Sequence, residues 1–220
     1  MTITNNIAAG CKFAGFLAPG YDCDTASTKF KDNVSHSNLG VGAAIFPDYL
    51  TGSNHFKCYE MSHFKAYKTT LPCVAAHYAT LEMRAHDLTC IDSNRGINLQ
   101  TGNESEKVVI KFYDSFIFGE TRADDCPTLA SCDCEEKFGL MLFGNNKGAK
   151  DFHILMPSAR PIYKIKSSGA WGGEVYVENV TFAKFATKGM TKCQNKIHVF
   201  ARNPYSSDKI PPHYFKNCKF

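Results

Sequence analysis

The sequence predicts an all-β fold built from stacked copies of one strand-containing unit. The clearest copy is residues 175–185, VYVENVTFAKF, in which apolar and polar residues alternate and the pattern shifts by one position at Asn179. Such alternation is typical of a half-buried strand. Degenerate copies recur along the chain without long helical patterns between them, which favours stacked β-structure over helix pairs. A chance recurrence of loose matches is the alternative.

The copies are spaced at a nearly regular interval. In each one, a small polar residue or a histidine precedes an apolar residue, and a second apolar residue usually follows two positions later. The intervals between the first apolar residues are 27, 30, 24, 28, 64 and 38 residues, and 64 is a little over two units of about 27. These apolar residues are Ile7, Val34, Phe64, Leu88, Phe116, Val180 and Cys218.

The individual strands are predicted from the same alternation and from the turn residues between them. Pro19 and Gly20 form a turn, and Gly40 and Gly42 form a tight corner, because no helix and no Lys-Ser/Thr follows as in a phosphate loop. A brief helix over 73–78 is the one exception that we expect. The predicted strand regions are 1–10, 11–24, 29–48, 58–71, 73–83, 84–100, 108–121, 138–166, 175–185, 191–202 and 214–220.

The composition is that of a globular protein, and 220 residues suit one large domain or two small ones. With the repeat running along the chain, we expect a single domain over residues 1–220. Hydrophobic residues make up 44% of the chain and charged residues 21%, which excludes wholesale disorder. The net charge is +4 and the Lys and Arg residues are scattered, so we expect no nucleic-acid partner. No apolar run approaches the roughly 18 residues that a membrane helix needs. We therefore expect no membrane span.

Ten cysteines indicate disulfides formed in an oxidising compartment. Their number is even, their spacing is scattered, and the chain lacks the C-x-x-C pairs of zinc sites. A disulfide between Cys11 and Cys23 would close the turn that lies between them.

Residues 121–137 differ in character from the rest of the chain. This segment, TRADDCPTLASCDCEEK, is acidic, contains almost no large apolar residue, and holds Cys126, Cys132 and Cys134. We expect a protruding loop pinned by disulfides. The alternative is a calcium site, but the spacing matches no EF-hand, and we assign neither a metal nor a cofactor. The carboxylates of that alternative are Asp124, Asp125, Asp133 and Glu135.

Three N-x-S/T sequons agree with an extracellular or cell-surface setting. They are glycosylation candidates at Asn33, Asn103 and Asn179, although Asn33 and Asn179 fall inside expected strands, where burial is the alternative. The first residues show no signal-peptide pattern, and both ends of the chain lie within repeat units. We therefore expect a fragment of a longer secreted or surface protein.

Several motifs, taken together and in order, carry a family resemblance. They are ITNNIAAG, FKDNVSHSN, HFKAYKT, LTCIDSNRGINLQ, VVIKFYDSFIFGET and VYVENVTFAKF. The set covers most of the chain and resembles the repeats of the fibrocystin and fibrocystin-like family. The acidic segment and the lack of a G8 domain before the repeats depart from that family.

The resemblance implies a right-handed parallel β-helix, a solenoid, in the ectodomain of a large cell-surface or secreted protein, often on cilia. Related proteins include hyaluronan-degrading surface enzymes, so a connection with glycans is also implied. No catalytic residue of those enzymes maps onto this sequence.

The sequence shows no catalytic constellation. Polar residues at repeat-equivalent positions predict two stacked ladders, one of His36, His63 and His86, and one of Asn6, Asn33, Asn179 and Asn217. A polysaccharide-acting enzyme would need converging carboxylates. Candidates at strand ends are Asp87, Asp92, Asp114 and Asp208, each better explained as a turn residue or a solvated charge.

Two classes of function therefore remain open. The leading hypothesis is a structural or interaction module whose rigid flank binds another protein, a second copy or a glycan, with end-to-end stacking into filaments. The alternative is a polysaccharide-acting hydrolase or lyase on the same scaffold. Carboxylates clustered with Lys, Arg or His in one groove would favour the enzyme, whereas a flank of Asn, Thr and aromatic residues would favour binding.

Overall fold

Every regular element that the structure describes is a β-strand. The computed structural model describes residues 2–18, 23, 30–45, 58–76, 82–93, 95–100, 109–119, 137–143, 174–183, 197–202 and 213–219. Within these ranges the chain forms strands, turns and bends and no helix. The predicted all-β class is confirmed.

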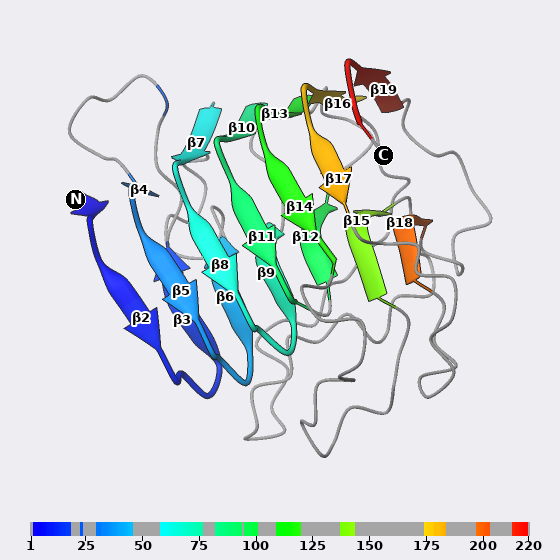
Figure 1. The fold of residues 1–220 in the computed structure, drawn as a ribbon. Helices are drawn as coiled ribbons and strands as arrows, with labels where there is room; N and C mark the ends of the chain where they lie inside the picture. The colour runs from blue at the N-terminus through cyan, green and yellow to red at the C-terminus, as the bar shows by residue number, and fades with distance from the viewer. Residues whose placement is uncertain are drawn as a thin grey trace, which may run out of the picture.

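The strands form three sheets, A, B and C, and every strand pairs in parallel with its neighbours (Figure 1). Sheet A contains β1 (Ile3–Thr4), β4 (Phe30–Lys31), β7 (Cys58–Ser62), β10 (Glu82–His86), β13 (Val109–Tyr113), β16 (Glu174–Glu178) and β19 (His213–Lys216). Sheet B contains β2 (Ile7–Ala9), β5 (Val34–His36), β8 (Lys65–Tyr67), β11 (Thr89–Ile91), β14 (Phe116–Phe118) and β17 (Thr181–Ala183). Sheet C contains β3 (Ala14–Ala18), β6 (Val41–Ile45), β9 (Pro72–Ala76), β12 (Arg95–Gln100), β15 (Lys137–Phe143) and β18 (Ile197–Arg202).

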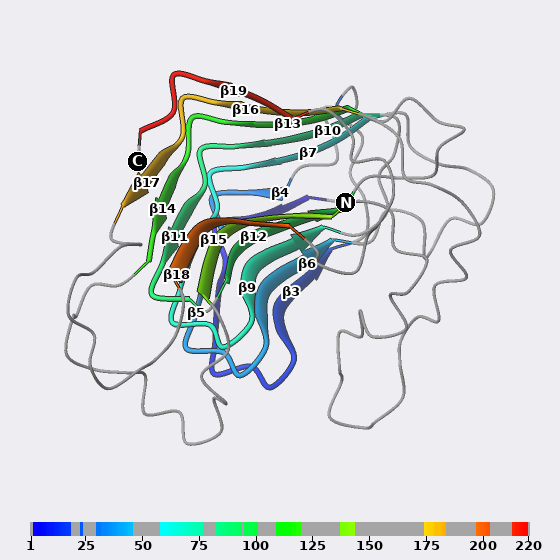
Figure 2. The ribbon, with the colours of Figure 1, turned by 90° about the vertical axis from the view of Figure 1, so that its right-hand side faces the viewer.

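The chain visits the three sheets in turn, and this order repeats. We call each successive set of one strand from A, one from B and one from C a rung. Each strand pairs with the strand three places later in the sequence, so that each rung lies on the one before it. In Figure 2 the strands of each sheet line up one behind another, and the three sheets border a common interior. Stacked units of one kind, as the sequence predicted, therefore build the described part of the chain.

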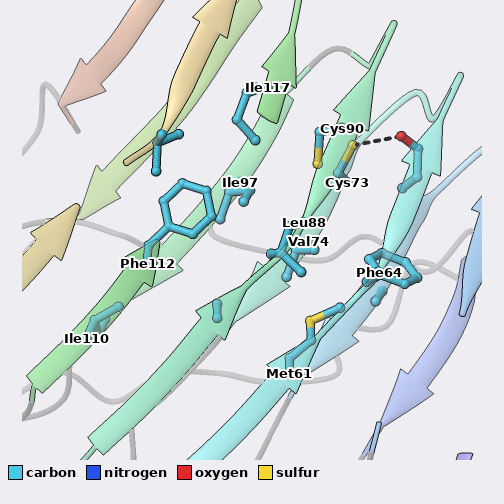
Figure 3. Close-up of a cluster of buried hydrophobic side chains, with 14 of the residues drawn as sticks. Met61, Phe64, Cys73, Val74, Leu88, Cys90, Ile97, Ile110, Phe112 and Ile117 are labelled. Atoms are coloured by element: carbon cyan, nitrogen blue, oxygen red, sulfur yellow. Dashed lines mark hydrogen bonds between the residues drawn. The ribbon is translucent and has the colours of Figure 1, made fainter. Parts of the chain in front are cut away.

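The interior is filled by the side chains that point inward from the three sheets. The rings of Phe16, Phe30 and Phe64 meet there with centroid distances of 5.4 to 6.1 Å. Because each rung alone has two open faces, stacking is what removes these side chains from water. Figure 3 shows part of this core, including Met61, Phe64, Leu88, Ile97, Ile110, Phe112 and Ile117.

One column of residues turns the chain sharply from sheet A to sheet B in every rung. Its members have φ between 49° and 59°, in the left-handed region. Asn, Asp and His are the non-glycine residues most often found there, since their short polar side chains bond locally. All seven members belong to these three types: Asn5, Asp32, His63, Asp87, Asp114, Asn179 and Asn217. The shift in the alternating pattern at Asn179 thus marks a corner between β16 and β17.

Three sequence predictions about the strands are wrong. The interval of 64 residues adds no rung between β13 and β16 or between β14 and β17, because these strands pair directly. Residues 72–76 form strand β9 rather than the start of a helix over 73–78. The apolar residues chosen as equivalent also fall in two adjacent columns: Ile7, Val34 and Phe116 lie in sheet B, whereas Phe64, Leu88, Val180 and Cys218 follow the corner residue.

A disulfide joins Cys23 to Cys58, the first residue of β7. Cys11 carries a free thiol, so the expected pairing of Cys11 with Cys23 is wrong. The prediction paired the two cysteines that bracket one turn and so considered only neighbours in sequence. Stacking of the rungs instead brings Cys23 next to a cysteine 35 residues later in the chain. Cys126, Cys132 and Cys134, with the acidic segment up to residue 136, lie outside the described residues. Among the described residues, no helix is long and apolar enough to cross a membrane.

Candidate functional site

Charged and aromatic side chains gather on the outer surface where sheet A meets sheet B. We call this the A–B corner, and it comprises the left-handed column together with the outward residues that end the strands of sheet A. The pairing register places these outward residues in one line: Thr4, Lys31, Ser62, His86, Tyr113, Glu178 and Lys216. Strand pairing fixes the spacing between successive members of both columns at about 4.8 Å.

The centre of the A–B corner is a histidine–carboxylate cluster. Nδ1 of His86 lies 2.7 Å from Oδ2 of Asp87, and Nε2 of His63 lies 3.8 Å from the same oxygen. Nε2 of His86 lies 4.0 Å from Oε1 of Glu60, so that carboxylates flank both of its ring nitrogens. The His86 ring stacks on Tyr113 with a centroid distance of 4.8 Å. Burial raises the pKa of the Tyr113 hydroxyl above its ordinary value.

The corner continues along the later rungs with polar and aromatic contacts. Nδ2 of Asn179 donates to Oδ1 of Asp114 at 2.9 Å. On the outer face of sheet A, Tyr176 stacks on Tyr214 at 4.8 Å, and both rings are substantially exposed. The Tyr176 hydroxyl donates to Oε2 of Glu174 at 2.6 Å, and this bond raises the pKa of Tyr176. Sequence reasoning missed these tyrosines, which are recognisable only once strand register aligns them.

A cationic pair holds one carboxylate on the same face of sheet A. Nε of Arg84 and Nζ of Lys111 each donate to Oε1 of Glu82 at 2.8 Å. These bonds, from Arg84 first and then Lys111, hold the pKa of Glu82 at about 2, against an ordinary value of 4.5. The pair crosses from β10 to β13, so it adds an electrostatic link between two neighbouring rungs.

The predicted histidine ladder does not form. His36 ends β5 in sheet B and stacks on Tyr67, with a centroid distance of 4.8 Å. His63 lies in the left-handed column and His86 in the neighbouring column, where their rings meet edge to face at 6.1 Å. Short, loosely similar motifs can be aligned one residue out of register. Such a shift moves a side chain to the other face of its strand.

The predicted asparagine ladder is divided between two columns for the same reason. Asn6 and Asn33 follow the corner residue, and Nδ2 of Asn6 donates to Oδ1 of Asn33 at 3.2 Å. Asn179 and Asn217 are themselves corner residues with positive φ, one column away. Of these four asparagines, only Asn6 and Asn33 are joined by a hydrogen bond.

The three sequons differ in their surroundings. Asn33 is fully buried, and its Nδ2 donates to the carbonyl of Ile3 at 2.9 Å, which leaves no room for a glycan on the folded chain. Its candidacy for glycosylation is therefore wrong for the folded state. Asn179 is exposed, and its amide is engaged by Asp114. Asn103 lies outside the described residues.

The structure separates the candidate carboxylates. Asp87 and Asp114 occupy adjacent rungs of the A–B corner, whereas Asp92 lies at the corner between sheets B and C, and Asp208 lies outside the described residues. Both corner aspartates have positive φ, so the backbone alone accounts for their residue type. Among the described residues, no group of three His, Cys, Asp or Glu side chains is arranged to hold a metal ion. The four carboxylates of the calcium alternative lie outside them.

Comparison with known proteins gives no relative from which a function could be transferred. No protein family, no curated protein and no solved structure matches the chain.

Proposed function

We propose that this chain is a structural or interaction module of an extracellular or cell-surface protein, whose A–B corner binds a partner protein or a glycan. The proposed scaffold is a parallel β-helix, since each strand pairs with the strand three places later in all three sheets. Its proposed hand is right, because crossover connections between parallel strands are almost always right-handed.

The observation that carries this proposal is the unbroken corner column. Seven left-handed residues present polar side chains on successive rungs, a span of about 29 Å at the strand spacing of about 4.8 Å. Parallel pairing holds every member at a fixed distance from the next, so binding requires little ordering of the surface. A linear ligand with repeated polar groups fits such an array, because each rung offers hydrogen-bonding groups at the same spacing.

The proposed compartment is the secretory pathway, as part of a larger protein, which on the family resemblance is often ciliary. The disulfide between Cys23 and Cys58 supports an oxidising environment. The ordered motifs that resemble fibrocystin-like repeats support a cell-surface rod.

The test compares aspartate-to-asparagine variants at two corners. Asp87→Asn and Asp114→Asn remove charge from the A–B corner while keeping a residue that tolerates positive φ. Asp92→Asn is the matched control, since Asp92 also has positive φ but lies at the other corner of sheet B. Binding of the chain is measured on immobilised neutral and anionic glycans and on a second copy of the chain. We expect about tenfold weaker binding for the first two variants and unchanged binding for the control. Equal losses in all three would contradict a role of the A–B corner.

End-to-end association is part of the same proposal. Strands β1, β2 and β3 each lie at one end of their sheet, and Ile7 and Leu17 of this rung are 72% and 61% exposed. Open parallel edges with apolar side chains favour pairing with another chain. Light scattering over a range of protein concentrations tests this association. We expect Ile7→Lys to reduce the mass of the assemblies. A native chain that stays monomeric at all concentrations would oppose end-to-end association.

The alternative is a polysaccharide-acting hydrolase or lyase, and the cluster around Asp87 is the observation that favours it. A carboxylate with two histidines nearby is a plausible acid–base pair, and Asp114 lies one rung away. Incubation with hyaluronan and with a pectin-like polymer tests this reading. Product formation that Asp87→Asn abolishes would replace the binding proposal with the enzyme, whereas no cleavage by the native chain opposes catalysis.

A further inference from the structure

Two free cysteines lie together in the core at the meeting of sheets B and C. Cys73 is in β9 of the third rung and Cys90 is in β11 of the fourth, and both are fully buried. The Cys73 thiol contributes to the raised pKa of Cys90, and Figure 3 shows the two side chains beside each other in the core. Sγ of Cys73 also contacts the Ala66 carbonyl at 3.6 Å and Oγ of Ser93 at 3.3 Å.

The repeat geometry shows how closely these two positions approach. The register aligns Gly15, Gly42 and Cys73 in one inward column of sheet C, and Ser35, Ala66 and Cys90 in one inward column of sheet B. Each residue of the first column faces the residue of the second column in the next rung. A Cβ built on Gly15 would overlap Oγ of Ser35, and one built on Gly42 would lie 2.9 Å from Cβ of Ala66.

Cys73 and Cys90 are the next pair in that series. One rung earlier the two columns approach to 2.9 Å, which is closer than the roughly 3.5–4.5 Å between the Cβ atoms of a disulfide. Small residues surround both thiols, because Cys73 lies opposite Ala66 in its own rung, and Cys90 contacts the carbonyl of Gly96 at 3.8 Å. The site therefore brings two thiols from adjacent rungs together where the backbones approach closely and the neighbouring side chains are small.

We propose that Cys73 and Cys90 form a second, internal disulfide that links the third and fourth rungs. In the reaction, one thiolate attacks a low-molecular-weight disulfide, forming a mixed disulfide and releasing one thiol. The other thiolate then attacks the cysteine sulfur of that mixed disulfide and releases a second thiol. Two electrons pass to the reagent, and the two cysteine protons end on the two released thiols.

Burial determines when this bond can form. Within the closed core, desolvation raises the pKa of Cys90 well above its ordinary value, so little thiolate is available and no reagent reaches it. The bond therefore forms while the third and fourth rungs are still open and is then sealed by their stacking. This disulfide depends on the proposed function only through the oxidising compartment. Because the test below supplies the oxidant in solution, its result does not depend on where the protein resides.

Peptide mapping tests the proposal directly. The full chain is refolded from the reduced, unfolded state in a mixture of reduced and oxidised glutathione, alkylated, and digested with trypsin without reduction. Trypsin cleaves after Lys68, Arg84 and Arg95, so Cys73 and Cys90 fall in separate peptides, 69–84 and 85–95, with no other cysteine. We expect these two peptides to be joined, with a mass two hydrogens below their sum. The disulfide between Cys23 and Cys58 serves as the internal control, joining peptides 13–29 and 58–65.

Recovery of both peptides with alkylated thiols, while the control pair is joined, would overturn the proposal, as would a bond from either cysteine to a third. Single and double substitutions, Cys73→Ala and Cys90→Ala, supply a second measurement. Closing a loop of this length is expected to raise the melting temperature by roughly 5–10 °C. After oxidative refolding, the melting temperature of each single variant should fall by as much as that of the double variant. If the two single decreases instead add up to the decrease of the double variant, the cysteines do not share a bond.

Discussion

Replacement of Asn33 by alanine tests whether buried hydrogen bonds hold the first two rungs together. The Asn33 side chain accepts bonds from the backbone N–H and from Nδ2 of Asn6, at 3.0 and 3.2 Å, and donates to the carbonyl of Ile3 at 2.9 Å. Asn33→Ala removes all three bonds and leaves a small cavity in their place. The variant therefore weakens the contact of β4 and β5 with the rung before them, while the bonds that pair the strands remain.

The expected loss in the free energy of unfolding is about 2 kcal/mol. Each hydrogen bond contributes about 1 kcal/mol net, and an unpaired buried group costs about 1–3 kcal/mol. Asn6 is exposed, so water replaces its bonds, whereas the Ile3 carbonyl is partly buried and loses its partner. Asn33→Asp separates these contributions, because a carboxylate keeps the acceptor but repels the Ile3 carbonyl. We expect it to be at least as destabilised as Asn33→Ala at pH 7, and to recover near pH 4, where a protonated carboxyl can donate.

Urea unfolding followed by circular dichroism measures the loss, and amide hydrogen exchange locates it. Because each rung contacts only its neighbours, faster exchange should be confined to residues 2–18 and 30–45 and should not reach 109–119. Lys65→Ala, an exposed residue of the next rung, is the control and should change stability by less than about 0.5 kcal/mol. A loss below about 0.5 kcal/mol in Asn33→Ala, or faster exchange throughout, would refute the reasoning.

Three further predictions concern charge, packing and backbone. Glu82 has a folded-state pKa of about 2, below its ordinary 4.5, so its ion pairs stabilise the fold above pH 4.5 and are lost as pH falls towards 2. The lowered pKa corresponds to about 3 kcal/mol of stabilisation, which the solvent exposure of both cationic partners reduces to about 1 kcal/mol. The difference in unfolding free energy between the native chain and Glu82→Gln, measured by urea unfolding, should vanish near pH 2. Phe64→Ala empties the centre of the core and should cost about 3–5 kcal/mol by the same assay, and a cost below about 1 kcal/mol would oppose the assigned burial. Gly42→Ala should lower the melting temperature because its Cβ would lie 2.5 Å from the Cys73 carbonyl oxygen, whereas Gly10→Asn, in open space at φ 67°, should change it little.

Local pattern was sufficient to predict the all-β class and the recurrence of one unit, and it showed the shift at Asn179, although the sequence placed that residue inside a strand and not at a corner. These features leave a direct mark on the sequence, because inward residues alternate with outward ones and every left-handed corner between sheets A and B is Asn, Asp or His. Stacking of the strands also followed from the recurrence, since a unit that cannot bury its own apolar face must bury it against the next. The parallel direction of the strands was implied only by the family resemblance.

Register, in contrast, could not be read from short motifs. Phe64 was chosen as the equivalent of Val34, yet the residue that pairs with Val34 is Lys65, which is exposed on sheet B, whereas Phe64 is buried at the corner. A shift of one residue moved the histidines and asparagines into wrong columns. The disulfide partner of Cys23 was missed for a related reason, because Cys58 becomes its neighbour only after the rungs stack.

The left-handed column also determines where a binding specificity can be encoded. At the corner itself the backbone conformation favours Asn, Asp or His, so the φ angle accounts for a carboxylate there without any ligand. This requirement weakens the case for Asp87 and Asp114 as a catalytic pair, since both would be acceptable with no substrate at all. The residue just before the corner has no such restriction, and along the rungs it varies widely in charge and size, from Lys31 and Ser62 to Tyr113. If the A–B corner recognises a partner, the corner column supplies a uniform polar line, and the adjacent column supplies the differences that select one partner over another. Exchanging His86 and Tyr113 for serine, the residue of the third rung, should therefore alter which ligand binds, while Asp87→Asn should weaken every ligand alike.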